Sequence, residues 1–300
     1  MQINHNNISW INLSNPKTND LDFLGSELRV SPLVLKQLLG FNKRPKIEEY
    51  ESYLFIVLHF PVFNRKTRQT ISAELDFIVS REKIITIFQN DNPALATIWK
   101  EMGLNEELRQ MHFKSSGFLL FSILDKLIDS CLPMLDHINE KIEDIEDKVF
   151  DGKEQEMLKE IAIVKRDIID FRRTIKPQRS VLEILAKKIG RFFHDENLDI
   201  ISQEVIGSQI RVWNTLENHK EMIEAIEKTN ESLLSYQINR VMHTLTFFSI
   251  VLFSLTFIAG FFSMHPMENS NSAEGLFVAA GSMILAVIVI TAIFKARKWM

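Results

Sequence analysis

The sequence is poor in cysteine and lacks the short motifs that mark common enzyme families. Its single cysteine, Cys131, excludes an intramolecular disulfide and suits a reducing compartment. It contains no Gly-rich phosphate loop, no HExxH pair and no nucleophile elbow. We therefore expect neither an enzyme nor a tightly bound cofactor. Since no nucleotide motif is present, any transport would be passive.

Two long runs lack charged side chains altogether. Leu245–Met264 contains none over 20 positions, and Leu276–Phe294 contains none over 19. At ~1.5 Å per helical residue, each run is long enough to cross a hydrocarbon core of ~30 Å. The sequence therefore predicts a membrane protein with spans at 244–264 and 276–294, joined by an extracytoplasmic loop at 265–275.

The charges around the spans predict their orientation. The loop contains Glu268 and Glu274 but no lysine or arginine, whereas Arg240 precedes the first span and a basic tail, 295–300, follows the second. By the positive-inside rule, both termini are expected in the cytoplasm and the loop outside a cell inner (plasma) membrane. The chain does not open with a basic start and an apolar stretch, so no cleaved secretory signal is expected.

The part before the spans carries a slight excess of acid. Setting aside the two acidic and three basic side chains that follow the first span leaves 37 acidic and 32 basic ones, a net charge of −5. This balance gives no reason to expect nucleic-acid binding.

The first 197 residues are predicted to form an α+β cytosolic domain. Strands rich in β-branched and aromatic residues are expected at 8–13, 53–60, 74–80 and 83–88, the last three in an antiparallel sheet. A helix is expected at 31–40, between Ser31 and Gly40. Periodic apolar residues predict one amphipathic helix at 116–150 and a second from about Glu154, which Pro177 interrupts.

The segment that follows is predicted to form one very long helix. From Leu198 to Gly260 there is no proline, and the only glycine before Gly260 is Gly207. The apolar pattern runs into the first span without a turn signal. We therefore expect a stalk helix at 198–243 that is continuous with that span and packs against copies of itself or against neighbouring helices.

One face of the first span combines polar, small and apolar residues in a stripe. Intervals of three and four keep its members on one side of a helix: Asn239, Met242, Leu245, Ser249, Phe253, Thr256 and Gly260. Around a common axis they would form alternating hydroxyl and apolar rings, which suit a gated pore for hydrated ions. A helix–helix contact in lipid, which also favours small and hydroxyl residues, is the alternative interpretation.

The same segment resembles a known family. Residues 239–265, NRVMHTLTFFSIVLFSLTFIAGFFSMH, are similar to the first span of the CorA family of divalent-cation transporters, most specifically at LTFIAG, 255–260. The likeness extends to KRPKIEEYESYLFIVLHF at 43–60, to RRTIKPQRSVLEIL at 172–185 and to the tail ARKWM, and thus covers nearly the full chain. It implies a funnel-shaped homopentamer in the bilayer that moves divalent metal ions, with the stripe on the pore-lining positions.

The sequence departs from the family at the outer mouth. The family signature Gly-Met-Asn is replaced by Ser263-Met264-His265, and Ser254 stands where the family has a proline. An imidazole titrates near pH ~6.5, whereas an amide does not titrate. Neutral imidazoles favour Zn²⁺ or Co²⁺, and protonated ones repel divalent cations. We therefore hypothesise altered selectivity and inhibition by external acid. A simple interfacial cap at His265 is the alternative.

Charged residues outside the stripe are candidates for secondary roles. Glu204 lies about where the family has an acidic residue that senses internal Mg²⁺, so it is a candidate regulatory metal ligand. Glu268 and Glu274 would form outer acidic rings that concentrate cations. The basic residues Lys295, Arg297 and Lys298 would ring the cytoplasmic mouth, anchor the second span at the lipid surface, or do both.

These observations support two functional hypotheses. The first is a CorA-like pentameric channel or transporter that moves Mg²⁺, Co²⁺ or Zn²⁺ down the electrochemical gradient. The second is a non-conducting or regulatory membrane scaffold that kept the architecture after losing ion selection. The replacements at Ser254, Ser263 and His265 make the second hypothesis credible.

Overall fold

The computed structural model of the protein describes residues 2–42, 44–64, 69–89, 92–193, 197–264 and 272–297, without the side chains of 197, 264 and 272–276. Its elements are β1 (Gln2–His5), β2 (Ile8–Ser14), α1 (Thr18–Glu27), α2 (Pro32–Leu38), β3 (Lys46–Glu49), β4 (Leu54–Asn64), β5 (Gln69–Val79), β6 (Lys83–Phe88), α3 (Pro93–Leu104), α4 (Glu106–His112), α5 (Ser116–Asp129), α6 (Leu132–Phe150), α7 (Glu154–Ile175), α8 (Gln178–Phe193), α9 (Asn197–Met264) and α10 (Ser272–Ala296). The chain divides into two units. The first comprises Met1–Asp151 and Glu156–Ile226, and the second comprises Gly152–Gln155 and Glu227–Met300.

The first unit is built on a six-stranded sheet in the order β1-β2-β6-β5-β4-β3. The predicted antiparallel pairing of β4, β5 and β6 is confirmed. The strand predicted at 8–13 joins the same sheet, but β2 runs parallel to β6, with Trp10 opposite Ile84. The buried Trp10 indole donates a hydrogen bond to Thr86 Oγ1 at 3.1 Å, which ties these two strands together by their side chains.

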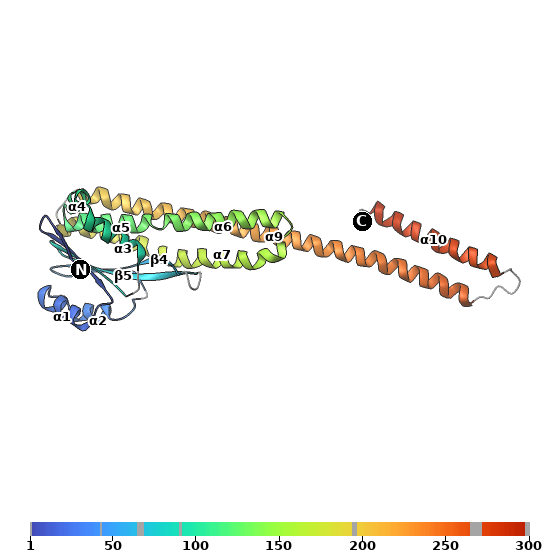
Figure 1. Ribbon diagram of the computed structural model, residues 1–300, viewed down its shortest axis with the longest axis horizontal. Helices are drawn as coiled ribbons and strands as arrows, with labels where there is room; N and C mark the ends of the chain where they lie inside the picture. The colour runs from blue at the N-terminus through green and yellow to red at the C-terminus, as the bar shows by residue number, and fades with distance from the viewer. Residues whose placement is uncertain are drawn as a thin grey trace. The chain divides into compact units, whose positions relative to one another are not determined.

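Helices cover both faces of this sheet (Figure 1). On one face, α1 and α2 close a core that includes Leu24, Val34, Phe55 and Ile85. On the other face, Trp10 packs edge-on against Trp99 of α3, with ring centroids 4.7 Å apart, and α5 contacts β5 and β6. Burial on both faces explains why β4 begins with eight consecutive buried residues instead of an alternating pattern.

Local sequence signals set several helix ends. The Ser31 and Asn92 side chains accept hydrogen bonds from the backbone at the starts of α2 and α3, and each helix has a proline in its first turn. Gly152 adopts a φ of 83° between α6 and α7, where a residue with a side chain would be strained. The helix predicted between Ser31 and Gly40 is confirmed as α2, Pro32–Leu38, with Ser31 as its N-cap.

Some predicted elements have different boundaries. The single helix predicted at 116–150 is two helices, α5 and α6, because Pro133 in the first turn of α6 cannot donate a backbone hydrogen bond to a preceding turn. Pro177 separates α7 from α8, as predicted. The strands β1 and β3 and the helix α1 were not predicted, since each is short and weakly patterned.

The predicted long helix is present as α9, which has 68 residues. Its part up to Ile226 belongs to the first unit, where Arg172 of α7 bonds Glu217 at 2.5 Å and stacks on Trp213 at 5.2 Å. Its remainder belongs to the second unit with α10 (Figure 1). The helix α10 begins at Ser272, inside the segment expected to be loop, because a helix can begin before the charge-free run that spans the membrane, here at Leu276.

Candidate ion pathway

Two helices of the described chain are long and apolar enough to cross a membrane, and these are α9 and α10. Both leave large apolar side chains uncovered, among them Phe253 with 77% of its surface exposed and Phe277 with 74%. A soluble core would bury such side chains. The second unit therefore has the surface of a lipid-embedded or subunit-contacting hairpin.

One face of α9 is covered by α10. Phe247 packs edge-on against Phe294, with ring centroids 5.3 Å apart, and Phe294 is buried. Six of the seven partly covered residues in 245–263 lie on the same side of α9 as Phe247: Phe247, Val251, Ser254, Leu255, Ile258 and Phe262. The seventh, Ser249, lies on the opposite side. The partly covered residues on α10 recur at intervals of three and four: Ala279, Ser282, Met283, Ala286, Val287, Ile290 and Thr291. Together with the contact of Phe247 and Phe294, the partial burial of these two sets marks the sides of α9 and α10 that face each other.

The stripe from Asn239 to Gly260 lies on the other side of α9. At ~100° per residue, its centre is about half a helical turn from the centre of the α10 contact. Six of its seven members are exposed and Ser249 is half-buried. The structure thus brings these residues to one face of the helix, and α10 does not cover that face.

The hydroxyl groups on this helix bond their own backbone. Ser249 Oγ donates to the carbonyl of Leu245 at 2.9 Å, and Thr256 Oγ1 donates to that of Leu252 at 2.8 Å. A hydroxyl has one proton to donate and two lone pairs to offer. Because the proton is used by the helix, the lone pairs of both oxygens are free to accept from water or to contact a cation.

Shallow grooves run along the exposed side of α9. One, of ≈ 570 Å³, includes Leu245 and Phe248; the other, of ≈ 400 Å³, includes Phe253, Thr256 and Gly260. A methyl group added at Gly260 would meet nothing within 4 Å, so this position leaves open space beside the helix. Both grooves are concave surfaces that an adjacent helix or lipid chain can fill.

Only part of the predicted outer mouth is described. Ser263 is exposed near the end of α9, and Met264 is its last residue. His265 and Glu268 lie outside the described residues, and the side chain of Glu274, in the first turn of α10, does too. On the tail, Lys295 and Arg297 are exposed, and Lys298 lies outside the described residues.

Glu204 sits in the first unit beside other acidic groups. It is exposed on α9, and its charge contributes to raising the pKa of Asp125, after burial, which is the larger cause. Asp125 accepts a hydrogen bond from Ser208 Oγ at 3.2 Å, which opposes that rise. Within the described residues, no set of three or more histidine, cysteine or carboxylate side chains is arranged to hold a metal ion.

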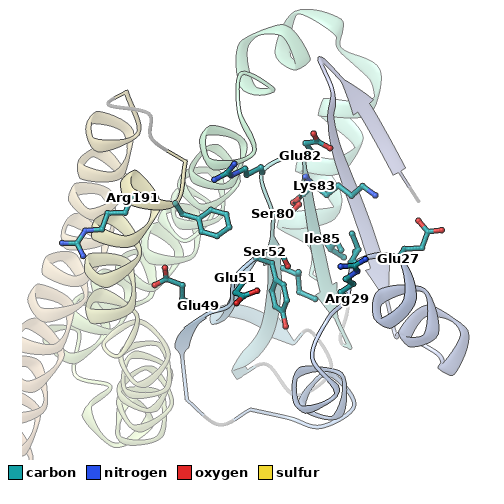
Figure 2. A pocket seen from close by; sticks show the side chains of 15 residues that line it. Glu27, Arg29, Glu49, Glu51, Ser52, Ser80, Glu82, Lys83, Ile85 and Arg191 are labelled. Carbon is teal, nitrogen blue, oxygen red and sulfur yellow. Dashed lines mark hydrogen bonds between the residues drawn. The ribbon is translucent and has the colours of Figure 1, made fainter.

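A larger cavity of ≈ 760 Å³ lies in the first unit, near the ends of β4, β5 and β6 (Figure 2). Four basic and four acidic side chains line it: Arg29, Arg81, Lys83, Arg191, Glu27, Glu49, Glu51 and Glu82. Figure 2 shows the heads of Arg191 and Lys83 pointing in opposite directions, and Lys188 bonds Glu49. Equal numbers of basic and acidic side chains leave the lining without a net charge.

Comparison with known proteins identifies the family. The model of the CorA-like Mg²⁺ transporter protein family matches residues 5–297, which include the sheet, the stripe and both apolar helices. The chain belongs to the CorA-like Mg²⁺ transporter family. It is therefore a member of a family of membrane transporters for divalent metal ions.

Individual relatives are distant but nearly full-length. The CorA-like chain is 25% identical over 295 residues to the cobalt/magnesium transport protein CorA of Thermotoga maritima, covering 97% of this chain and 83% of that one. It is 22% identical over 298 residues to the zinc transport protein ZntB of Yersinia pseudotuberculosis, covering 97% and 88%. Relatives of this kind thus include proteins named for different metals.

Solved structures share the fold. The complete structure of the CorA magnesium transporter from Methanocaldococcus jannaschii matches with a TM-score of 0.85 at 19% identity, covering 100% of this chain and 94% of that one. The full-length CmaX protein matches with a TM-score of 0.75 at 16% identity, covering 97% and 89%. The CorA-like architecture expected from the sequence, with its sheet, long helices and long apolar-ended helix, is confirmed.

Ser254 has a place in the CorA-like hairpin that the sequence analysis does not predict. It not only replaces a proline of the family but also lies on the side of α9 that faces α10. The spacing of Phe247, Val251, Ser254 and Ile258 carried that signal, since it matches a second helical face.

Proposed function

We propose that this chain assembles as a homopentamer in a cell inner (plasma) membrane, with both termini cytoplasmic, and conducts divalent cations. The path runs along the common axis and is lined by the stripe of α9. Mg²⁺, Co²⁺ or Zn²⁺ moves down its electrochemical gradient. The membrane potential contributes ~2.3 kcal/mol per charge per 100 mV, hence about twice that for a divalent ion.

The observation that carries this proposal is the uncovered stripe. A pore-lining face must be free of the helix's own partner, and the stripe lies opposite the α10 contact. The free lone pairs of Ser249 and Thr256 suit hydrated cations, while Leu245 and Phe253 provide apolar constrictions that gate by dewetting. Assembly around an axis would also cover apolar surface that the single chain leaves exposed. The number of five copies rests on the family resemblance.

Cation flux into liposomes tests the proposal most directly. The purified chain is reconstituted with an ion-sensitive dye inside, and Mg²⁺, Co²⁺, Ni²⁺ and Zn²⁺ are added in turn under an imposed inside-negative potential. We expect flux of at least one of these ions, increasing with the potential. If the chain is assembled in the liposomes and none of the four ions enters, the conducting function is wrong.

Two matched serines test where the path lies. Ser249 belongs to the stripe and Ser254 to the α10 contact, and both hydroxyls bond the carbonyl four residues earlier. In a Cys131→Ala background, Ser249→Cys is expected to lose about tenfold or more of its flux after reaction with a positively charged methanethiosulfonate, because five added charges repel the cation. Ser254→Cys is expected to keep its flux. Equal effects at both positions would contradict a path along the stripe.

The altered signature at 263–265 gives the proposed selectivity. His265→Asn restores the amide of the family signature and is expected to remove inhibition by external acid between about pH 5 and about pH 8. It is also expected to shift preference from Zn²⁺ towards Mg²⁺, because imidazole nitrogen favours the borderline metal. Flux that is unchanged by this substitution and flat with pH would leave His265 as an interfacial cap.

A scaffold without conduction is the second candidate function. The replacements Ser263 and His265 at the position of the family signature favour it. It predicts a stable assembly, no flux of any divalent ion, and no change of flux when thiols on the stripe are modified. The liposome experiment therefore separates the two candidates.

A further inference from the structure

A buried polar cluster lies on the α1/α2 side of the sheet in the first unit. His59 of β4 and Glu74 of β5 are directly opposite each other, and Asp76 lies two residues further along β5, on the same face. His59 and Asp76 are each only 4% exposed. Two carboxyl groups and an imidazole thus share a site that contributes nothing to the proposed ion path.

Glu74 is held by the segment that follows α2. The backbone N–H of Asn42 donates to Glu74 Oε2 at 2.6 Å, and Asn42 Nδ2 donates to Glu74 Oε1 at 2.6 Å. Two short bonds from N–H donors suit an ionised carboxylate, which accepts at both oxygens. This pair is the polar attachment of the Phe41–Asn42 segment to the sheet.

Asp76 cannot share that arrangement as a second anion. It lies beside Glu74 on the same face of β5, and its Oδ1 is buried without a hydrogen-bond partner in the described part of the chain. Burial, followed by the charge of Glu74, raises the pKa of Asp76 to about 8. A protonated Asp76 has an O–H that donates to the Glu74 carboxylate, so one proton shared by the pair satisfies both groups.

The neighbouring groups do not supply a compensating charge. His59 Nε2 is 3.9 Å from Glu74 Oε2, and burial lowers the pKa of His59, which favours the neutral imidazole. On β3, Lys46 opposes the rise at Asp76 but is bonded to Glu48 and to Gln37 of α2. Gln89, after β6, donates to the carbonyls of Leu38 and Gly40. The cavity beside the pair, ≈ 20 Å³, has room for about one water molecule.

We propose that the proton shared by Asp76 and Glu74 is a latch that holds the Phe41–Asn42 segment on the sheet, and that loss of this proton releases the segment. With the proton, Glu74 presents both oxygens to Asn42. Without it, two adjacent buried anions repel each other, and the Glu74 carboxylate can relieve the repulsion only by moving away, which breaks its bonds to Asn42. The cytosolic domain thereby contains an alkaline-sensitive element.

The direction in which pH changes the stability follows from the number of protons bound in the folded and unfolded states. An unfolded aspartate titrates near pH ~3.9, while the folded Asp76 holds its proton up to a pKa of about 8. Between these values the folded state binds one more proton than the unfolded state. The unfolding constant therefore rises up to about tenfold per pH unit in this window, and the contribution levels off above it.

Asp76→Asn is the main test, made in the full chain in detergent. The asparagine amide donates to Glu74 as the shared proton does, but it cannot be lost. Protection of residues 38–42 from hydrogen–deuterium exchange is compared with that in the wild type at the same pH, from about pH 6 to about pH 9. The ratio at each pH removes the intrinsic pH dependence of exchange. We expect protection in the wild type to fall about tenfold or more relative to Asp76→Asn towards the alkaline end.

A control variant and a measurement on the wild type test the latch further. Glu82→Gln, an exposed carboxylate between β5 and β6, should follow the wild type. In the wild type itself, difference infrared spectra should show the C=O stretch of a protonated carboxylic acid at neutral pH that disappears on alkaline titration. This measurement needs no variant, so it remains decisive if Asp76→Asn fails to fold. Identical pH dependence in wild type and Asp76→Asn, or absence of the protonated band at neutral pH, would overturn the latch. The latch would also be overturned if Asp76→Asn were destabilised and added Mg²⁺ increased the protection of the wild type from exchange. A bound cation would then occupy the pair.

Discussion

The sheet core and the second half of α9 are both rich in phenylalanine, leucine and isoleucine, yet they use these residues in opposite ways. Phe77 in the sheet is 0% exposed, whereas Phe253 on α9 is 77% exposed. In the first unit, helices on both faces of the sheet cover its apolar side chains. In the second unit, α10 covers one face of α9 only. Similar apolar residues thus form a buried core in the sheet of the first unit. On α9 of the second unit they form a surface that lipid or further copies of the chain must cover.

Polar side chains differ between the regions in the same way. In the sheet, Thr86 and Trp10 bond each other across strands, so their hydrogen bonds specify tertiary structure. On α9, Ser249, Ser254 and Thr256 bond carbonyls of their own helix. A helix whose polar groups are satisfied internally can enter lipid without tertiary partners. Its remaining lone pairs become available only where water or an ion reaches them.

The largest expected effect tests the buried side of this comparison. Phe77→Ala in the sheet core is expected to destabilise the folded chain by about 3–5 kcal/mol, because it removes a fully buried ring and leaves a cavity. Phe253→Ala is the matched control and is expected to leave the stability of the single chain nearly unchanged. Denaturant unfolding in detergent measures both. Equal losses would show that the two phenylalanines are buried alike in solution.

The next effect tests the exposed side. Phe253→Ala is expected to raise divalent-cation flux on the order of tenfold, since removing five rings lets water wet an apolar constriction. Phe248→Ala, exposed but about a third of a turn from the centre of the stripe at ~100° per residue, is the control and should leave flux unchanged. The measurement is initial uptake into liposomes at fixed potential. A larger effect at Phe248 than at Phe253 would place the water path on another face of α9.

A smaller effect concerns the stability of the folded chain at acidic pH. Burial lowers the pKa of His219, whose Nδ1 has no hydrogen-bond partner, although the charge of Asp136 opposes this. Below pH ~6.5 the unfolded state therefore gains a proton that the folded state does not, and the unfolding constant rises by up to about tenfold per pH unit as pH falls. His219→Gln should reduce this acid sensitivity, and exposed His137→Gln should not. Urea midpoints at neutral and mildly acidic pH, measured in detergent, decide between them.

The smallest effect concerns the two acidic residues between the charge-free runs. Replacing Glu268 and Glu274 by glutamine is expected to weaken uptake severalfold at low ionic strength and very little at high salt, because the screening length falls from ~30 Å at 0.01 M to ~10 Å at 0.1 M. Uptake from dilute divalent-cation solutions at the two salt concentrations measures this. A salt-independent loss would point to direct coordination of the ion instead of concentration by charge.

Particular elements show how far the sequence could predict this fold. The strands β4, β5 and β6 follow from dense β-branched and aromatic runs, and α9 follows from the absence of proline between Leu198 and Gly260. The break between α5 and α6 was missed because the apolar periodicity continues across it while Pro133 interrupts the backbone bonding. The parallel β2–β6 pairing connects residues more than seventy positions apart, and no local pattern encodes it.

The candidate site also combines features that the sequence predicts with features that it does not predict. Helical periodicity alone placed seven residues on one stripe, because the period of an α-helix is a property of the backbone. Which side of α9 meets α10 depends on how the two helices pack, so only the tertiary structure shows the contact of Phe247 with Phe294 and the place of Ser254. The spacing of residues did not predict the polar cluster at Asp76 either, since its members come from two strands, β4 and β5, and are held by Asn42 after α2.

By itself, the sequence determined the membrane spans, the continuous helix and the family, because charge-free length, helical period and local motifs act over neighbouring residues. The tertiary structure decided which face of α9 stays open and which carboxyl groups are buried side by side. Both depend on contacts between segments far apart in the chain, whose burial changes the free energy of a side chain without changing its identity.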